Sequence, residues 1–196
     1  MTRHFLKIGS GLAVRPIRDQ LVAHSGLWGA HGNRRYTGSP HADSSDIWVR
    51  YRALEELTEP ARFLEPHVSV WHPCAERLPA VVEIAEMLMK DPQVRGERLG
   101  GVLLTKLRPG GKITPHVDRG WHAGEYEKFY VAVQNEPGAV FGWPLGDVLA
   151  RDGDVWWFRN DVPHWVSNDS AEDRISLIVC IKTSAFDYCY DERRAA

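Results

Sequence analysis

The half of the chain that follows Gly100 is a series of short apolar runs separated by glycine, proline, aspartate and asparagine, and this pattern restricts the fold more than any other feature. Apolar runs of this length, divided by turn residues, are typical of β-strands. Many short strands in succession predict a sandwich, a jelly roll or a barrel. The pair Asp152-Gly153 stands between two of the runs and predicts a hairpin there. The runs lie at residues 102–107, 129–134, 140–141, 155–158, 165–166 and 175–181.

The first half of the chain has a different character. Residues 15–24 and 79–90 predict helices, and in the second of these Pro79 suits the first turn while apolar side chains recur on one face. Residues 31–46 are rich in Gly, Asn, Ser, Pro and Asp and predict a long loop. Residues 47–52 alternate apolar and polar side chains, which predicts a strand. The expected fold class is therefore mainly β with flanking helices.

The 196 residues suit a single domain, because a chain of this length can bury one sizeable core. We expect a helical, loop-rich N-terminal part with an early strand at residues 1–98. The β-rich core is expected at 99–183, and a C-terminal tail at 184–196.

Composition narrows the setting in which such a domain works. The formal net charge is −2, which does not indicate the basic face of a nucleic-acid-binding protein. No apolar run approaches the roughly 20 residues of a membrane span, and the first ten residues do not read as a secretory signal. Three cysteines without a CxxC pair fit a reducing compartment. We expect a cytoplasmic protein that acts on a small molecule or a peptide, with neither membrane nor nucleic acid as a partner.

One short segment carries residue types that bind metals. His116 and Asp118 stand two residues apart, and residues two apart on an extended chain project to the same side. An imidazole and a carboxylate can therefore meet at one point, and His164 can supply a third ligand. Two histidines and one carboxylate on one face of an octahedron form the facial triad of non-haem iron(II) oxygenases. We expect His116, Asp118 and His164 to be metal ligands and catalytic residues.

Arg174 follows His164 by ten residues, which is enough for one strand to turn and for the next to return as its neighbour. On that return strand Arg174 and Ser176 share a face. A guanidinium fork can grip the far carboxylate of 2-oxoglutarate through two hydrogen bonds, and a hydroxyl can support it. The spacing therefore indicates an iron(II) enzyme that uses 2-oxoglutarate and O2 as co-substrates.

These segments resemble the iron(II)/2-oxoglutarate oxygenases, most closely the aspartyl/asparaginyl β-hydroxylase-like branch. The resemblance covers roughly residues 46–183 and implies a double-stranded β-helix, a jelly-roll core of cupin type. It also implies that His116, Asp118 and His164 hold iron and that Arg174 holds the co-substrate. The strongest stretches are residues 107–118 (LRPGGKITPHVD), 153–158 (GDVWWF), 164–168 (HWVSN) and 173–179 (DRISLIV).

The same branch often places a hydroxyl residue before the HxD strand, and Thr105 fits that position. It also places a basic residue and a histidine on the next strand, where Lys128 and Tyr130 stand here. The resemblance thus implies that these three residues contact the co-substrate, with Lys-Phe-Tyr in place of the usual Arg-x-His. Animal members of the branch lack the acidic iron ligand. Because this chain keeps Asp118, it is more similar to the bacterial free-amino-acid hydroxylases of the branch.

The expected reaction is hydroxylation of a C–H bond of an amino acid, or of an Asp/Asn-type residue in a peptide or protein, with release of succinate and CO2. The substrate is expected to contact Arg50 on the early strand, or Arg119, Trp121 and His122 after the HxD pair. Five histidines of the first half are expected at the surface or in loops. They are His24, His31, His41, His67 and His72.

Two other functions are compatible with the residues. The first is a cupin-like metalloenzyme of another reaction type, either a zinc hydrolase or a dioxygenase that does not use 2-oxoglutarate. A hydrolase would have no use for Arg174 and Ser176 in this register, so dependence on 2-oxoglutarate separates the two. The second is a binding module with a decayed site, against which the complete set of ligands argues.

Overall fold

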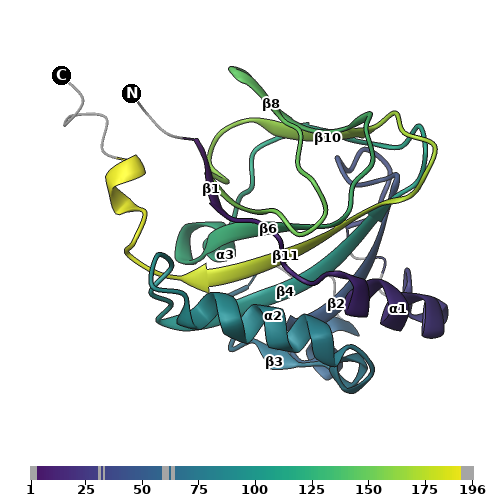
Figure 1. Ribbon diagram of the computed structural model, residues 1–196. Helices are drawn as coiled ribbons and strands as arrows, with labels where there is room; N and C mark the ends of the chain where they lie inside the picture. Colours follow the sequence, from purple (N-terminus) through teal and green to yellow (C-terminus); the bar gives the residue numbers. More distant parts are fainter. Residues whose placement is uncertain (1–3, 31, 33, 59–61, 63–64, 191–196) are drawn as a thin grey trace.

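Two antiparallel β-sheets face each other in the computed structural model, which describes residues 4–30, 32, 34–58, 62 and 65–190 (Figure 1). The larger sheet has seven strands. Across the sheet they are β1 (Phe5–Gly9), β9 (Val155–Phe158), β6 (Glu127–Gln134), β11 (Arg174–Lys182), β4 (Arg98–Leu107), β2 (Ser44–Tyr51) and β3 (Val70–Trp71). The smaller sheet has four, in the order β5 (Lys112–His116), β10 (His164–Asn168), β7 (Ala139–Trp143) and β8 (Gly146–Val148).

The larger sheet is covered on both faces, because the side chains of its strands alternate between two apolar layers. On β11, Leu177 and Val179 belong to the core that the sheet shares with the helices. Ser176 and Ile178 alternate with them along the strand, face the smaller sheet and line a cavity there. Strands buried on both faces carry long apolar runs rather than a clean apolar and polar alternation. This explains why residues 102–107, 129–134 and 175–181 are so apolar.

Two helices cover the outer face of the larger sheet, as Figure 1 shows for α1 (Arg15–Ala23) and α2 (Pro79–Lys90). These bounds confirm the helices predicted at residues 15–24 and 79–90. On α2 the buried residues recur with helical spacing and pack into the core below. They are Ala80, Val81, Ile84, Ala85 and Leu88. The shorter helical segments are η1 (Ser25–Leu27), η2 (Leu54–Thr58), η4 (Pro73–Arg77), α3 (Trp121–Glu125) and η5 (Asp187–Cys189).

The strand predicted at residues 47–52 is β2, which begins three residues earlier, at Ser44. The loop predicted over residues 31–46 therefore ends sooner, because pairing with β4 extends the strand into polar residues. Strand β1 was not predicted from the sequence. This segment has five residues and pairs with β9 at the edge of the larger sheet, so tertiary pairing rather than a long local pattern forms it.

The hairpin predicted at Asp152-Gly153 is wrong. The residues do form a turn, in which the Asp154 amide donates to the Arg151 carbonyl at 2.9 Å. However, β8 before the turn pairs with β7 in the smaller sheet, and β9 after it pairs with β1 and β6 in the larger one. Gly153 has a φ of +81°, and a Cβ there would lie 2.5 Å from the Leu12 carbonyl oxygen. The glycine thus permits close backbone contact with another segment as well as the turn.

The expectation that Arg174 lies on a strand next to the one bearing His164 is also wrong. β10 pairs with β5 and β7, whereas β11 pairs with β4 and β6. The connection between them crosses from the smaller sheet to the larger. Arg174 and His164 therefore approach the same cavity from opposite sheets.

Residues of the N-terminal part contribute β1, β2 and β3 to the larger sheet. In the C-terminal tail, Phe186 stacks on Trp157 with ring centroids 4.8 Å apart, while residues 191–196 lie outside the described part of the chain. Neither α2 nor any other described helix has the length and apolar character that crossing a bilayer takes. The single domain and its three parts remain a prediction.

Candidate metal centre

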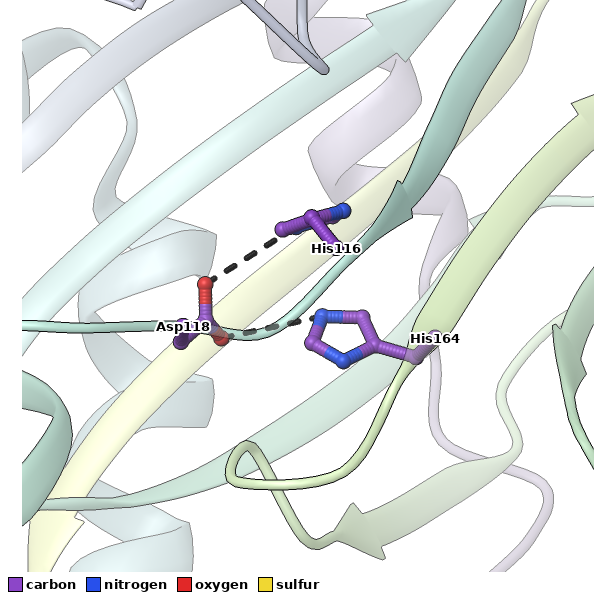
Figure 2. Close-up of side chains that lie close together, drawn as sticks. All are labelled: His116, Asp118 and His164. Carbon is purple, nitrogen blue, oxygen red and sulfur yellow. Dashed lines mark ion pairs between the residues drawn. The ribbon is translucent and has the colours of Figure 1, made fainter.

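His116 and His164 lie opposite each other in the antiparallel pair of β5 and β10, at the end of the first strand and the start of the second. Asp118 follows β5 by two residues, and its amide donates to the Asn160 carbonyl at 3.0 Å. Asp118 Oδ1 lies 3.8 Å from His116 Nε2, and Oδ2 lies 3.7 Å from His164 Nε2 (Figure 2). The three candidate ligand atoms lie within 4.8 Å of one another. The structure thus brings the three predicted ligands together.

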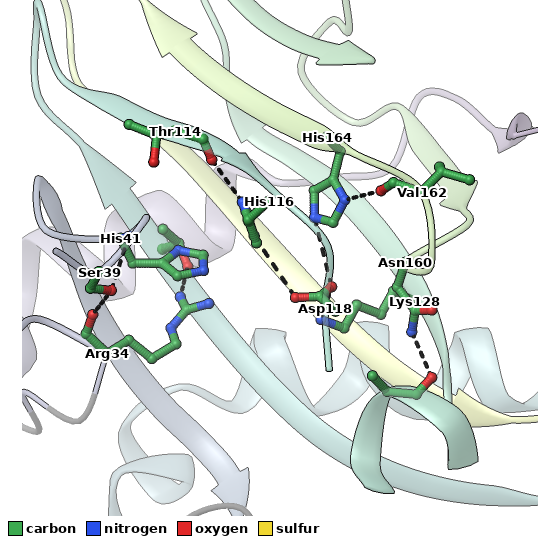
Figure 3. Close-up of polar contacts among 12 residues, drawn as sticks. Arg34, Ser39, His41, Thr114, His116, Asp118, Lys128, Asn160, Val162 and His164 are labelled. Carbon is green, nitrogen blue, oxygen red and sulfur yellow. Dashed lines mark hydrogen bonds and ion pairs between the residues drawn. The ribbon is translucent and has the colours of Figure 1, made fainter. Parts of the chain in front are cut away.

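Both histidines present the same nitrogen to this point. His116 Nδ1 lies 2.8 Å from the Thr114 carbonyl oxygen, and His164 Nδ1 lies 3.0 Å from the Val162 carbonyl oxygen (Figure 3). A carbonyl can only accept, so each Nδ1 carries the hydrogen and donates it. The lone pair of each neutral ring is then on Nε2, the atom that faces Asp118. Such outer hydrogen bonds orient metal-binding histidines in proteins.

The charge state of the three groups also suits a cation. Burial lowers the pKa of His164 to about 4 and that of His116 below its ordinary value, so both rings are neutral at neutral pH. Burial alone would raise the pKa of Asp118. The Lys128 ammonium, 2.5 Å from Oδ2, and the two imidazoles outweigh burial and hold that pKa well below its usual range. Two neutral nitrogens and one carboxylate oxygen are therefore available together.

The donor set fits a divalent transition metal such as iron(II). Imidazole and carboxylate are ligands for iron, and the arrangement of two histidines and one carboxylate matches the facial triad. Within the described part of the chain the cluster contains these three residues, so a metal held by them keeps positions for other ligands. Structural zinc sites usually have four protein ligands.

A cavity of about 200 Å3 lies between the two sheets and contains the triad in its wall. Its floor is the inner face of the larger sheet. Arg174 is 2% exposed and donates from Nε to Asn135 Oδ1 at 3.1 Å and from Nη1 to Ser176 Oγ at 3.3 Å. Its guanidinium lies over the Tyr130 ring, 5.0 Å from the centroid. Arg174, Ser176 and Tyr130 all line the cavity, as expected of residues that contact the co-substrate.

Two further predicted co-substrate residues also lie in this wall. Thr105 stands directly opposite Ser176 in the pair of β4 and β11. Lys128 lines the cavity too, but in the structure its ammonium is bonded to the Asp118 carboxylate.

The four predicted substrate contacts divide into two groups. Arg119 and His122 line the cavity. Neither Arg50 nor Trp121 is among the described residues that line it. The Arg50 guanidinium lies over the Trp71 ring at 5.2 Å, on the outer edge strand, and Trp121 packs against His122 with ring centroids 5.5 Å apart.

Arg34 and His41 are among the residues of the cavity wall that sequence reasoning missed. The His41 ring lies 4.7 Å from the His116 ring, and burial followed by the nearby Arg34 charge lowers its pKa to about 2. His41 does lie in a loop, as expected, but the loop folds over the site (Figure 3). Loops carry no periodic pattern that would reveal this. Another histidine expected at the surface or in a loop, His72, is buried and bonded through both ring nitrogens. His31 lies outside the described residues.

Two solved structures are similar to this chain, and the first of them supports the fold. The viral collagen prolyl hydroxylase of Paramecium bursaria Chlorella virus-1, solved as a 2-oxoglutarate complex, is similar over 92% of this chain and 96% of its own, with 12% identity and a TM-score of 0.53. An oxidoreductase of the 2OG-Fe(II) oxygenase family from Burkholderia pseudomallei matches 73% of this chain and 70% of its own, with 17% identity and a TM-score of 0.49. The predicted double-stranded β-helix is confirmed.

Comparison of the sequence is more specific about the family. No curated protein matches the sequence significantly. The family described as aspartyl/asparaginyl β-hydroxylase matches residues 63–183, which include β4 to β11 and every member of the triad. This chain therefore belongs to the aspartyl/asparaginyl β-hydroxylase family of enzymes.

Proposed function

We propose that this protein is an iron(II)- and 2-oxoglutarate-dependent dioxygenase that hydroxylates a C–H bond of an amino acid or of an Asp/Asn-type residue in a peptide or protein. One observation carries the proposal. A single cavity holds two histidines and an aspartate with their ligand atoms within 4.8 Å, together with a buried arginine and a serine from the opposite sheet. This is the combination that a metal-bound dicarboxylate needs.

In this proposal His116, Asp118 and His164 hold iron(II). When bound with 2-oxoglutarate, iron(II) supplies the activation of O2 that converts 2-oxoglutarate to succinate and CO2 and a substrate C–H to C–OH. The protein itself orients the ligands. The carbonyls of Thr114 and Val162 fix the two rings. Lys128 holds Oδ2 of Asp118, which restrains the rotation of that carboxylate.

Arg174 and Ser176 are proposed to receive the far carboxylate of 2-oxoglutarate. The Asn135 side chain and the Tyr130 ring fix the guanidinium from behind. Burial raises the pKa of Tyr130, so its phenol stays protonated and remains neutral beside the ligand. Among the described residues, four cationic side chains and one carboxylate line the cavity, so an anion is favoured there. The cations are Arg34, Arg119, Lys128 and Arg174.

The apolar part of the wall keeps water away from the reaction. Phe141, Phe158 and Val166 line the cavity next to His164, and the His164 ring lies 5.4 Å from the Phe158 ring. Arg119, which is exposed, and His122 are proposed to meet the substrate. The three cysteines are free, and a reducing cytoplasm is the proposed location.

The proposal is tested by anaerobic addition of 2-oxoglutarate to the iron(II)-loaded protein, read by the charge-transfer absorbance of the chelated oxo acid. The wild type should develop this absorbance and, with O2, release succinate even in slow turnover without substrate. Arg174→Met should bind iron(II) normally but need at least about tenfold more 2-oxoglutarate, because a charge-assisted pair is lost. A wild-type protein that binds metal yet neither chelates nor consumes 2-oxoglutarate would favour the zinc hydrolase or another dioxygenase.

A panel of amino acids and of peptides containing Asp or Asn then identifies the substrate by succinate release above the uncoupled rate. Retention of Asp118 makes free amino acids the first compounds to test.

A further inference from the structure

The cavity contains a second arginine, Arg34, that is also held in place by side-chain hydrogen bonds. Arg34 Nε donates to Asp46 Oδ2 at 3.0 Å and Nη2 donates to Asp46 Oδ1 at 2.9 Å. Nη2 also donates to Thr105 Oγ1 at 3.1 Å. The side chain of Asp46 is 2% exposed and does not line the cavity among the described residues, whereas Arg34 does. The carboxylate therefore stands behind the guanidinium and fixes its orientation.

The anchoring of the Arg34 guanidinium leaves one nitrogen available. For Arg34 the two bonds to Asp46 and the one to Thr105 use the hydrogens of Nε and Nη2, and no described residue accepts from Nη1. For Arg174 the bonds to Asn135 and Ser176 use Nε and Nη1, and the Tyr130 hydroxyl is a further hydrogen-bond partner of the same guanidinium. Arg34 and Arg174 both lie in the wall of one cavity.

The two arginines meet through a pair of neighbouring hydroxyls. Thr105 on β4 bonds to Arg34, and Ser176 on β11 bonds to Arg174. Thr105 and Ser176 are direct partners in the antiparallel pair of these strands, so their Cβ atoms lie about 5 Å apart. Asp46 is in turn the partner of Thr105 on β2. One row across the sheet thus holds the two hydroxyls that accept from the two guanidiniums.

The charges agree with this arrangement. Two guanidiniums carry two positive charges, and Asp46 balances one of them. One carboxylate from a ligand would balance the other. Resting on the proposed function, we propose that Arg34, oriented by Asp46 and Thr105, is a second arginine for the far carboxylate of 2-oxoglutarate.

The test measures oxo acid binding to Mn(II)-loaded protein by calorimetry, with 2-oxoglutarate and with 2-oxopentanoate. The second compound has the same five carbons and lacks the far carboxylate. Arg34→Met should weaken 2-oxoglutarate by about tenfold or more and leave 2-oxopentanoate unchanged, since only the first offers the carboxylate to the guanidinium. Arg34→Lys should recover only part of the loss, because an ammonium cannot keep the fork to Asp46 and also reach the ligand.

Arg35→Met is the matched control, because Arg35 is the exposed neighbour of Arg34 and does not line the cavity. It should bind both compounds as the wild type does. The double variant Arg34→Met with Arg174→Met should lose less than the product of the two single losses, because both side chains grip one group.

An Arg34→Met variant that weakens both oxo acids equally would assign Arg34 a purely structural role and overturn the inference. An Arg34→Met variant that binds 2-oxoglutarate normally would also overturn the inference, and would indicate that Arg34 contacts the substrate instead. Failure of the proposed function is distinguishable from these outcomes, because the wild-type protein itself would then show no preference for 2-oxoglutarate over 2-oxopentanoate.

Discussion

The ammonium of Lys128 lies 2.5 Å from Oδ2 of Asp118, inside the wall of the cavity. Lys128 thereby supplies the counter-charge that a largely buried carboxylate needs when no metal is bound. A metal held by Asp118 would supply the same charge. The two cations therefore have overlapping electrostatic effects on Asp118, and removal of the lysine should make the folded protein depend more on the metal.

Lys128→Met should lower the stability of the metal-free protein by about 3 kcal/mol, because it leaves a buried charge unpaired. Thermal melting with and without Mn(II) measures this. The rise in Tm on adding saturating Mn(II) should be larger in the variant than in the wild type. Lys128→Arg, which keeps the charge, is the control. Equal metal-induced shifts in Lys128→Met and wild type would contradict this account of Lys128.

His164→Ala should reduce the affinity for Mn(II) or Co(II) by at least about 100-fold. Removing a hydrogen bond to a metal ligand typically reduces metal affinity by less than this. The larger loss is expected because His164 Nε2 faces the centre of the three-residue cluster. Calorimetric titration of the metal-free protein gives the affinity and the stoichiometry. His24→Ala, which changes a half-buried histidine outside the cluster, should bind one metal per chain like the wild type. Full binding by His164→Ala would show that other residues hold the metal.

Acid should destabilise the metal-free protein below about pH 6.5, the ordinary pKa of histidine. Burial lowers the folded-state pKa of His41 to about 2, of His122 to about 3 and of His164 to about 4. The unfolded chain therefore takes up protons first as the pH falls, and stability present above pH 6.5 is lost progressively toward pH 4. Each histidine contributes up to about 1.4 kcal/mol per pH unit in that window.

Urea unfolding of the metal-free protein at pH 7.5, 6.5, 5.5 and 4.5 tests the sign. Glu127 acts in the opposite direction near pH 4.5, because burial raises its pKa, so the clearest interval is 6.5 to 5.5. His122→Asn should show a shallower loss of stability than the wild type over that interval. A wild-type stability that is flat or rises on acidification would refute the prediction.

Gly153→Ala should destabilise the protein by about 2–4 kcal/mol. The φ of +81° disfavours any Cβ, and a Cβ there would also lie 2.5 Å from the Leu12 carbonyl oxygen and 2.8 Å from the Leu12 nitrogen. Gly110→Ala separates the two effects. Gly110 has a similar φ of +74° but open space around it, so its substitution should cost about 1 kcal/mol. Similar losses for the two variants, measured by urea unfolding, would mean that contact with Leu12 adds nothing.

The same glycine shows what local sequence patterns can and cannot predict. The turn at Asp152-Gly153 was predictable, since the pair favours one. Which strands it joins was not, because a turn between strands of one sheet and a turn between two sheets use the same residues. The helices at Arg15–Ala23 and Pro79–Lys90 were predictable to within a residue, because an apolar face of helical period and a proline at the start specify them locally.

The candidate site divides in the same way. His116, Asp118 and Ser176 were accessible from sequence because short spacings on extended strands determine which side chains share a face. Arg34 and His41 were not, because they belong to a loop without periodicity whose path over the site is set by contacts far away in the chain, such as those with Asp46 and His116. Lys128 was placed in the right cavity, and only the structure pairs it with Asp118.

The alternation along β11 has a consequence for how this enzyme can change. Leu177 and Val179 anchor the helices, while Ser176 and Ile178, one residue away, border the reaction space. Substitutions at every second position can therefore reshape the ligand pocket while the layer under the helices stays unchanged. Along this strand, substitutions at one set of alternate positions should lower stability, and substitutions at the other set should change ligand preference. New substrate preferences can then arise through single substitutions.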